Sequence, residues 1–226
     1  MTTKRFFNPF IGRYYQVGIA GKKILVIGNS FYCSHREDCK HFQECTDMSK
    51  KDSSRFDDRC PDYSPRKMSL SDAPSYELDE MYRAYRNFGE FLSGYVDGMD
   101  SRTVWQYVSF TNYVQFFVPS AISDSRAAIS ERDFEAFKET VMELQPDIIF
   151  VWGTIAGDAI RQGRKEIYDY DTPEFHAKDG YVCHLKLDGI DKDIAIINTY
   201  HPCNMYGQWN SGLPSLKKYT EEELCI

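Results

Sequence analysis

The sequence contains no apolar run that approaches the roughly 20 residues a membrane-spanning helix needs. It also lacks the apolar core of a signal peptide, because Asn8 and Pro9 follow directly after Phe6 and Phe7. We therefore expect a soluble cytoplasmic protein without a membrane partner.

Acidic residues are absent from three stretches, residues 1–23, 101–123 and 194–220, although the chain carries a net charge of -7. The overall acidic balance argues against a protein that coats nucleic acid through charge alone. The uneven distribution fits an enzyme that meets a phosphate backbone through one face, and chance clustering is the alternative.

The tight cysteine pair of common zinc sites is missing as well. Four of the seven cysteines, Cys33, Cys39, Cys45 and Cys60, lie in or beside a polar excursion at about residues 33–75, separated by five, five and fourteen residues. A stretch this long without periodicity is usually functional or held in place by something. A structural zinc ion or an iron-sulfur cluster on the four thiolates would hold it, and reduced structural thiols are the alternative.

The remaining pattern is that of a single α/β domain spanning residues 1–226, 42% of which are hydrophobic. An alternating segment at 181–187 predicts an edge hairpin with the last strand. The buried strands are predicted at residues 24–28, 103–110, 147–152 and 194–198.

Helices are predicted between these strands. Apolar residues recur at three- and four-residue steps over 76–97, and Ser130 with Asp133 makes a capping box for a helix that stops at Pro146. A short helix follows Gly153. This alternation indicates a mostly parallel sheet covered by helices.

Polar residues stand where the buried strands end. Asn29 and Ser30 follow the first strand, Asn112 the second, Gly153 the third and His201 the last. Because the carboxyl ends of parallel strands meet at one rim, we expect these residues to line one pocket. For each residue alone, a turn, a cap or a core hydrogen bond is the simpler interpretation.

Together these strand ends resemble the motifs of the uracil-DNA glycosylase superfamily, in the same order and at similar separations, over about residues 24–209. The resemblance implies a three-layer α/β/α sandwich with a central four-stranded, mostly parallel sheet. It also implies a DNA-repair hydrolase that excises a base from DNA. The matching segments are GNSFYC at 28–33, FTN at 110–112, VWGTIA at 151–156 and HPC at 201–203.

The resemblance also implies roles for single residues. His201 matches the family histidine that donates a hydrogen bond to the carbonyl of the leaving base, and Asn112 matches the asparagine that reads the base edge. Gly28 and Phe31 belong to the base-binding loop, where Phe31 replaces the usual proline. Tyr32 matches the tyrosine that excludes a methyl group in one branch of the family.

The loop after His201 corresponds to the family segment that inserts an apolar wedge into the duplex as the base leaves. Met205, Tyr206 and Trp209 are the candidate wedge residues. A surface loop whose aromatic side chains pack inward is the alternative.

One departure weakens the expected chemistry. The most active branch of the family has an acidic residue in its first loop, and Ser30 occupies that position here. A serine can orient water but cannot balance a cationic sugar, so Ser30 and the adjacent Asn29 are the candidate catalytic residues of this loop together with His201. Glu37 or Asp38 of the excursion are further candidates for the missing charge.

Three functions follow from these patterns. The first is a glycosylase that removes uracil or another deaminated or damaged base from DNA, including single-stranded DNA, and needs no cofactor for its chemistry. The second is a catalytically weak or inactive binder of a modified base, a nucleotide or nucleic acid. The third is a metal- or redox-responsive module in which the cysteine excursion is the working part.

Overall fold

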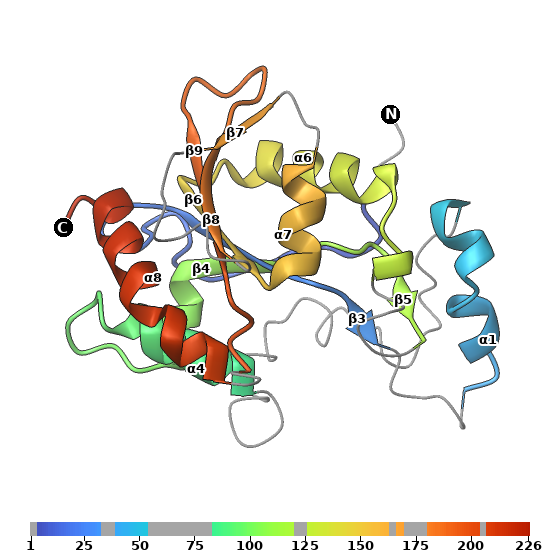
Figure 1. The fold of residues 1–226 in the computed structure, drawn as a ribbon, viewed down its shortest axis with the longest axis horizontal. Helices are drawn as coiled ribbons and strands as arrows, with labels where there is room; N and C mark the ends of the chain where they lie inside the picture. Colours follow the sequence, from blue (N-terminus) through green and yellow to red (C-terminus); the bar gives the residue numbers. More distant parts are fainter. Residues whose placement is uncertain are drawn as a thin grey trace.

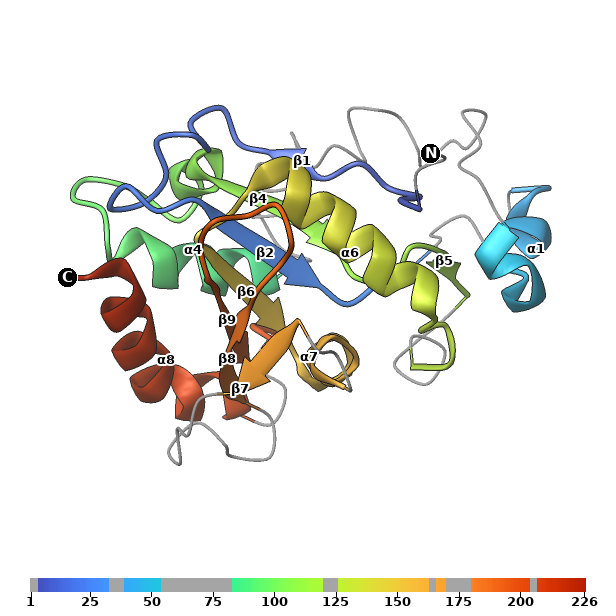
Figure 2. The ribbon, with the colours of Figure 1, turned by 90° about the horizontal axis from the view of Figure 1, so that it is seen from above.

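The computed structural model of the chain describes residues 4–32, 39–53, 83–119, 126–162, 166–169, 180–203 and 207–226. These residues form a mixed α/β fold in which helices lie on both sides of a twisted sheet (Figure 1, Figure 2). Within the described ranges, none of the helices has the length and apolarity that spanning a membrane requires.

The main sheet has seven strands in the order β1-β4-β2-β6-β9-β8-β7. The four central strands β4, β2, β6 and β9 run parallel, and β1, β8 and β7 are added in antiparallel pairing. The strands are β1 (Phe10–Ile11), β2 (Ile24–Gly28), β4 (Val108–Asn112), β6 (Ile148–Trp152), β7 (Ile167–Asp169), β8 (Tyr181–Leu185) and β9 (Ile194–Thr199).

This topology confirms the parallel core and the antiparallel pairing of β8 with β9. The sheet has more strands than the four that were predicted for its centre. Strands β1 and β7 were missed because they are only two and three residues long and leave little signal in the sequence. A separate two-stranded sheet joins β3 (Phe31–Tyr32) to β5 (Phe117–Val118).

Each central strand is buried on both faces, as its continuous apolar run predicts. In β2, Ile24 and Val26 face one core, while Leu25 and Ile27 face the other. Helices α4 (Arg83–Ser93) and α8 (Gln208–Leu224) cover the first core, and α6 (Glu131–Leu144) and α7 (Thr154–Arg161) cover the second. The sheet therefore lies between two helical layers.

Several predicted helix boundaries are confirmed. Ser130 and Asp133 form the capping box of α6, and Gln145 ends this helix in the left-handed conformation before Pro146. Helix α7 begins directly after Gly153. Of the helix predicted at 76–97, α4 lies in the described part.

The strand predicted at residues 103–110 begins later than expected. Residues Thr103–Tyr107 form a 3-10 helix, and only β4 after it is extended. The carboxylate of Asp100 accepts the backbone N–H groups of Arg102 (3.0 Å) and Thr103 (2.6 Å), which closes a turn at this point. This local hydrogen bonding overrides the β-propensity of the segment.

A buried ion pair joins the cysteine-bearing segment to α6. Lys51 in the 3-10 helix Met48–Ser53 places its Nζ 2.6 Å from the Asp133 carboxylate, and the two side chains are only 5% and 0% exposed. The same carboxylate accepts the backbone N–H groups of Gln115 (2.8 Å) and Ser130 (2.9 Å). Burial raises the pKa of Asp133, while Lys51 and these N–H groups act in the opposite direction.

We expect Lys51→Ala to lower the free energy of unfolding by about 3–5 kcal/mol, because it leaves the Asp133 carboxylate buried without its counter-ion. Lys50→Ala is the matched control, since the Lys50 side chain is 56% exposed, and a change within about 0.5 kcal/mol is expected there. Urea unfolding followed by tryptophan fluorescence measures both. Equal losses in the two variants would contradict a structural role for the buried pair.

Candidate functional site

The carboxyl ends of the four parallel strands form one rim of the sheet (Figure 1). Gly28 pairs with Asn112 across β2 and β4, Ile27 pairs with Val151 across β2 and β6, and β9 ends beside β6. Neighbouring strands lie about 4.8 Å apart, so the three intervals from β4 to β9 span about 14 Å. The structure thus places the predicted polar strand ends side by side along one edge.

Asn112 lies at the β4 end of this rim and is only 6% exposed. A Cβ on Gly28 would stand 2.2 Å from Asn112 Oδ1, so only glycine lets the amide lie over the β2 backbone. The amide makes no hydrogen bond with any other residue in the described part of the chain. It is therefore able to donate to and accept from the edge of a ligand.

The loop after β2 is fixed against the segment after β4. The backbone N–H groups of Tyr113 and Val114 donate to the carbonyls of Gly28 and Asn29, each at 2.9 Å. Asn29 Oδ1 is buried, and within the described ranges it has no hydrogen-bond partner. Such an acceptor costs about 1–3 kcal/mol unless a donor reaches it, which makes it a candidate contact for a ligand or a water molecule. Ser30, beside it, is half-buried.

His201 lies at the β9 end of the rim. The backbone N–H of Cys203 donates to its Nδ1 at 3.3 Å, and its ring meets Trp152 edge to face at 5.9 Å between centroids. Because Nδ1 accepts this bond, the neutral ring carries its proton on Nε2. The side chain keeps access to solvent, yet desolvation by the surrounding protein lowers the pKa of His201 to about 4. At neutral pH the rim therefore holds an uncharged Nε2–H donor.

Two buried amide side chains that the sequence prediction missed position the rim. Asn198 Nδ2 donates to the carbonyls of Val151 (3.0 Å) and Gly153 (2.9 Å), which fastens the end of β6 to β9 just before His201. The Gly153 N–H donates in return to the Thr199 carbonyl at 2.8 Å. The only signal in the sequence was an asparagine inside an otherwise apolar strand.

Gln115 plays the same part behind Asn112. Its Nε2 donates to the Asn112 carbonyl at 2.8 Å, and its Oε1 accepts the backbone N–H groups of Phe6 (2.8 Å) and Phe7 (3.0 Å). Gln115 is buried, and its backbone N–H is the group held by Asp133. Gln115 thus holds the backbone of Asn112, and it is itself held by the amino-terminal arm and by α6.

Two predicted contact residues pack against other aromatic side chains. Trp209 is 3% exposed in the first turn of α8 and packs against Phe88 and Phe91, so its prediction as a DNA wedge is wrong. The half-buried Phe31 packs edge to face on Phe7, with ring centroids 4.5 Å apart, in a small aromatic cluster. Helix α8 itself was not predicted, because Gly207, Gly212 and Pro214 hide its apolar period.

Other predicted residues fall outside the described part. These are Met205 and Tyr206 of the wedge, and the side chain of Tyr32. The same holds for Cys33 and Cys60 of the metal prediction.

The cysteine site is described only in part. Cys39 and Cys45 are half-buried and lie before and at the end of the short helix α1 (Phe42–Cys45). Among the described residues, no cluster of three or more histidine, cysteine, aspartate or glutamate side chains is suited to a metal ion. Binding of zinc or an iron-sulfur cluster by the four cysteines stays a prediction.

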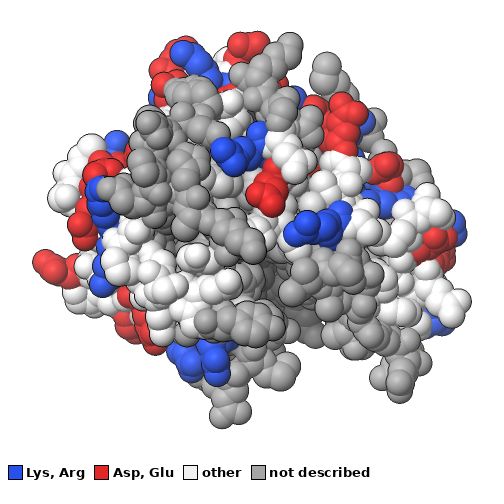
Figure 3. Space-filling view, viewed as in Figure 1, with Lys and Arg blue, Asp and Glu red and all other residues white. Residues whose placement is uncertain are grey.

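Charges of both signs are mixed among the described residues on one face of the molecule (Figure 3). On the face shown in Figure 3, the lysine and arginine side chains of the described residues are interspersed with aspartate, glutamate and uncharged side chains.

We expect the imidazole of His201 to stay neutral from pH 8 down to about pH 5 and to protonate with a midpoint near 4, because its pKa is lowered by desolvation. Proton–nitrogen NMR correlation of the ring, assigned with a His201→Asn variant, measures both the midpoint and the tautomer. The proton is expected on Nε2. A midpoint near the ordinary value of 6.5, or a proton on Nδ1 at pH 7, would contradict the arrangement.

Comparison with known proteins adds no family to this geometry. No protein-family model matches the chain, and no curated protein matches it either. The function must accordingly be inferred from the rim itself, with its Asn112 amide at one end and its neutral His201 donor at the other.

Proposed function

We propose that the protein is a uracil-DNA glycosylase-like hydrolase that removes uracil or another deaminated or damaged base from DNA. The observation that carries the proposal is the pairing, on one rim, of a hydrogen-bond donor that is neutral at pH 7 with a buried amide that has no hydrogen-bond partner among the described residues. The parallel order β4-β2-β6-β9 between two helical layers fits the sandwich fold that this family implies.

The proposed chemistry breaks the bond between the base and its sugar. The base leaves with the electron pair, and negative charge develops on its carbonyl oxygen, where the Nε2–H of His201 would donate. The Asn112 amide would pair with the base edge after the base has left the stack. Water then adds to the sugar carbon and leaves an abasic site.

The described residues of the loop after β2, residues 29–32, supply no carboxylate for this step. Ser30 and Asn29 would orient the water, but neither carries the charge that balances a cationic sugar. We therefore expect slow turnover on DNA, without a cofactor in the chemistry. Damaged or single-stranded DNA is the proposed partner, because a base that is already unpaired costs less to extract. The cytoplasm is the proposed location.

A second candidate follows from the same neutral loop. If Ser30 stabilises the cationic sugar of the transition state too weakly for turnover, the rim would still bind a modified base or nucleotide. This binder would show saturable association with a strong dependence on salt, and it would form no abasic product.

Labelled single- and double-stranded oligonucleotides that contain uracil, hypoxanthine or xanthine test the proposal, with cleavage at abasic sites as the readout. We expect product from at least one substrate, and a rate about 10²–10³-fold lower for His201→Ala, because the donor to the leaving base is lost. His41→Ala is the matched control, since the half-buried His41 precedes α1 outside the rim; its rate is expected to be unchanged.

The outcomes separate the two candidates. Binding without product from any substrate favours the second candidate. Product whose rate does not change in His201→Ala contradicts the proposed role of the rim.

A further inference from the structure

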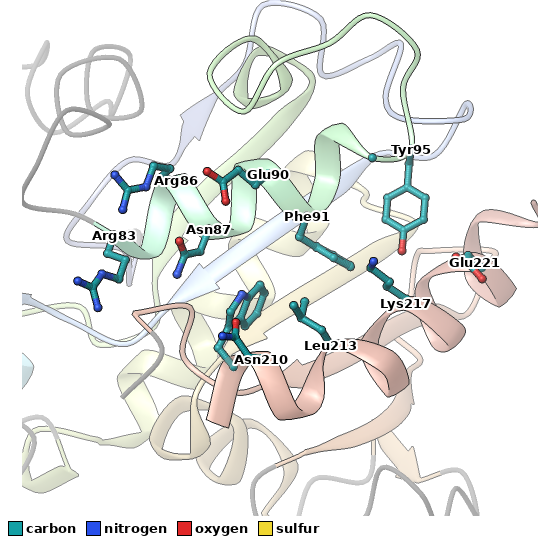
Figure 4. Close-up of a pocket in the computed structure, with 12 residues that line it drawn as sticks. Arg83, Arg86, Asn87, Glu90, Phe91, Tyr95, Asn210, Leu213, Lys217 and Glu221 are labelled. Carbon is teal, nitrogen blue, oxygen red and sulfur yellow. The ribbon is translucent and has the colours of Figure 1, made fainter. Parts of the chain in front are cut away.

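A cavity of about 590 Å³ opens between α4 and α8 (Figure 4). Among the described residues, none of those proposed for the chemistry of base excision lines it. Its walls carry Arg83, Arg86 and Glu90 from α4, and Lys217 and Glu221 from α8. The described lining residues thus carry three cations and two carboxylates, one net positive charge.

One hydrogen bond ties this cavity to the rim. Asn87, which lines the cavity, donates its Nδ2 hydrogen to the Pro202 carbonyl at 2.6 Å. Pro202 directly follows His201. Because Arg83 precedes Asn87 by four residues on α4, its side chain lies one turn away on the same side of the helix. The end of the cavity at Arg83 and Asn87 is therefore adjacent to the loop that carries His201.

The cations are divided between the two ends of the cavity. In Figure 4 the guanidinium groups of Arg83 and Arg86 lie together near Asn87, whereas Lys217 and Glu221 are at the opposite end. Glu90 stands on α4 one turn after Arg86. In the described part of the chain neither arginine has an ion-pair partner within 4.0 Å, and both side chains are exposed.

We propose that Arg83 and Arg86 form a phosphate-binding subsite for the nucleic-acid strand whose base enters the rim at His201. A guanidinium group offers a planar fork of N–H donors that fits phosphate oxygens. A base drawn out of the stack leaves its flanking phosphates at the surface, and α4 is the element joined to the His201 loop. The inference rests on the proposed function, because it takes nucleic acid as the ligand and His201 as the place where its base enters.

Fluorescence anisotropy of a labelled, unmodified oligothymidine with the full chain tests the subsite, in salt from about 50 to about 200 mM. For the double variant Arg83→Ala with Arg86→Ala we expect about tenfold weaker binding, because each of two solvent-exposed charge contacts is worth about threefold in affinity. The slope of log Kd against log salt should fall by about 1.4, which is about 0.7 for each lost phosphate contact on a single strand.

Two further variants test whether the loss of binding is specific to the two arginine side chains. Lys217→Ala removes a cation from the other end of the same cavity and should change Kd less than about twofold, because it lies away from Asn87. Replacing both arginines by lysine keeps the charge and should restore most of the salt slope, which excludes misfolding as the cause. An unchanged slope in the double alanine variant, or an equal loss in Lys217→Ala, would overturn the proposal.

Failure of this subsite and failure of the proposed function give different results. The oligothymidine contains no base to be excised, so its binding reports on strand contacts alone. If the arginine variants lose oligothymidine binding but the unsubstituted protein forms no abasic product, only the proposed excision chemistry is contradicted. If the protein forms abasic product but both arginine substitutions leave oligothymidine binding unchanged, only the subsite proposal is contradicted.

Discussion

The carboxylate of Asp133 is the contact on which the rest of the structure depends, because it joins three segments that are distant in the sequence. It pairs with Lys51, caps α6 through Ser130, and holds the backbone N–H of Gln115. Gln115 in turn holds the Asn112 carbonyl. A charge buried this deeply is stable only while its donors stay in place, so the fold and the rim are coupled through one group.

The rim has two halves with different chemistry. At β2 and β4, the amides of Asn29 and Asn112 offer acceptors and donors that suit recognition of a base edge. At β6 and β9, His201 offers a single directed proton. Gly28 and Gly153 lie between these groups, and a side chain on Gly28 would collide with the Asn112 amide. The division suits a site that reads one edge of a planar ligand and polarises another.

Sequence reasoning predicted the central strands and the shared rim, because a run buried on both faces and the direction of parallel strands are encoded locally. The wedge prediction failed at Trp209, because the sequence alone does not distinguish an apolar side chain that enters DNA from one that packs in the core. Sequence reasoning also failed at Gln115 and Asn198, whose partners lie up to about one hundred residues away. Such long-range hydrogen bonds leave no pattern in the neighbouring sequence.

The two bonds from the backbone of Phe6 and Phe7 to Gln115 extend the site to the amino-terminal arm. Any change that peels this arm away, whether proteolytic trimming or a bulky fusion placed ahead of it, would deprive a buried oxygen of both its donors. The disturbance would then pass through Gln115 to the asparagine at the sheet edge. The amino-terminal arm is therefore a remote support of ligand recognition.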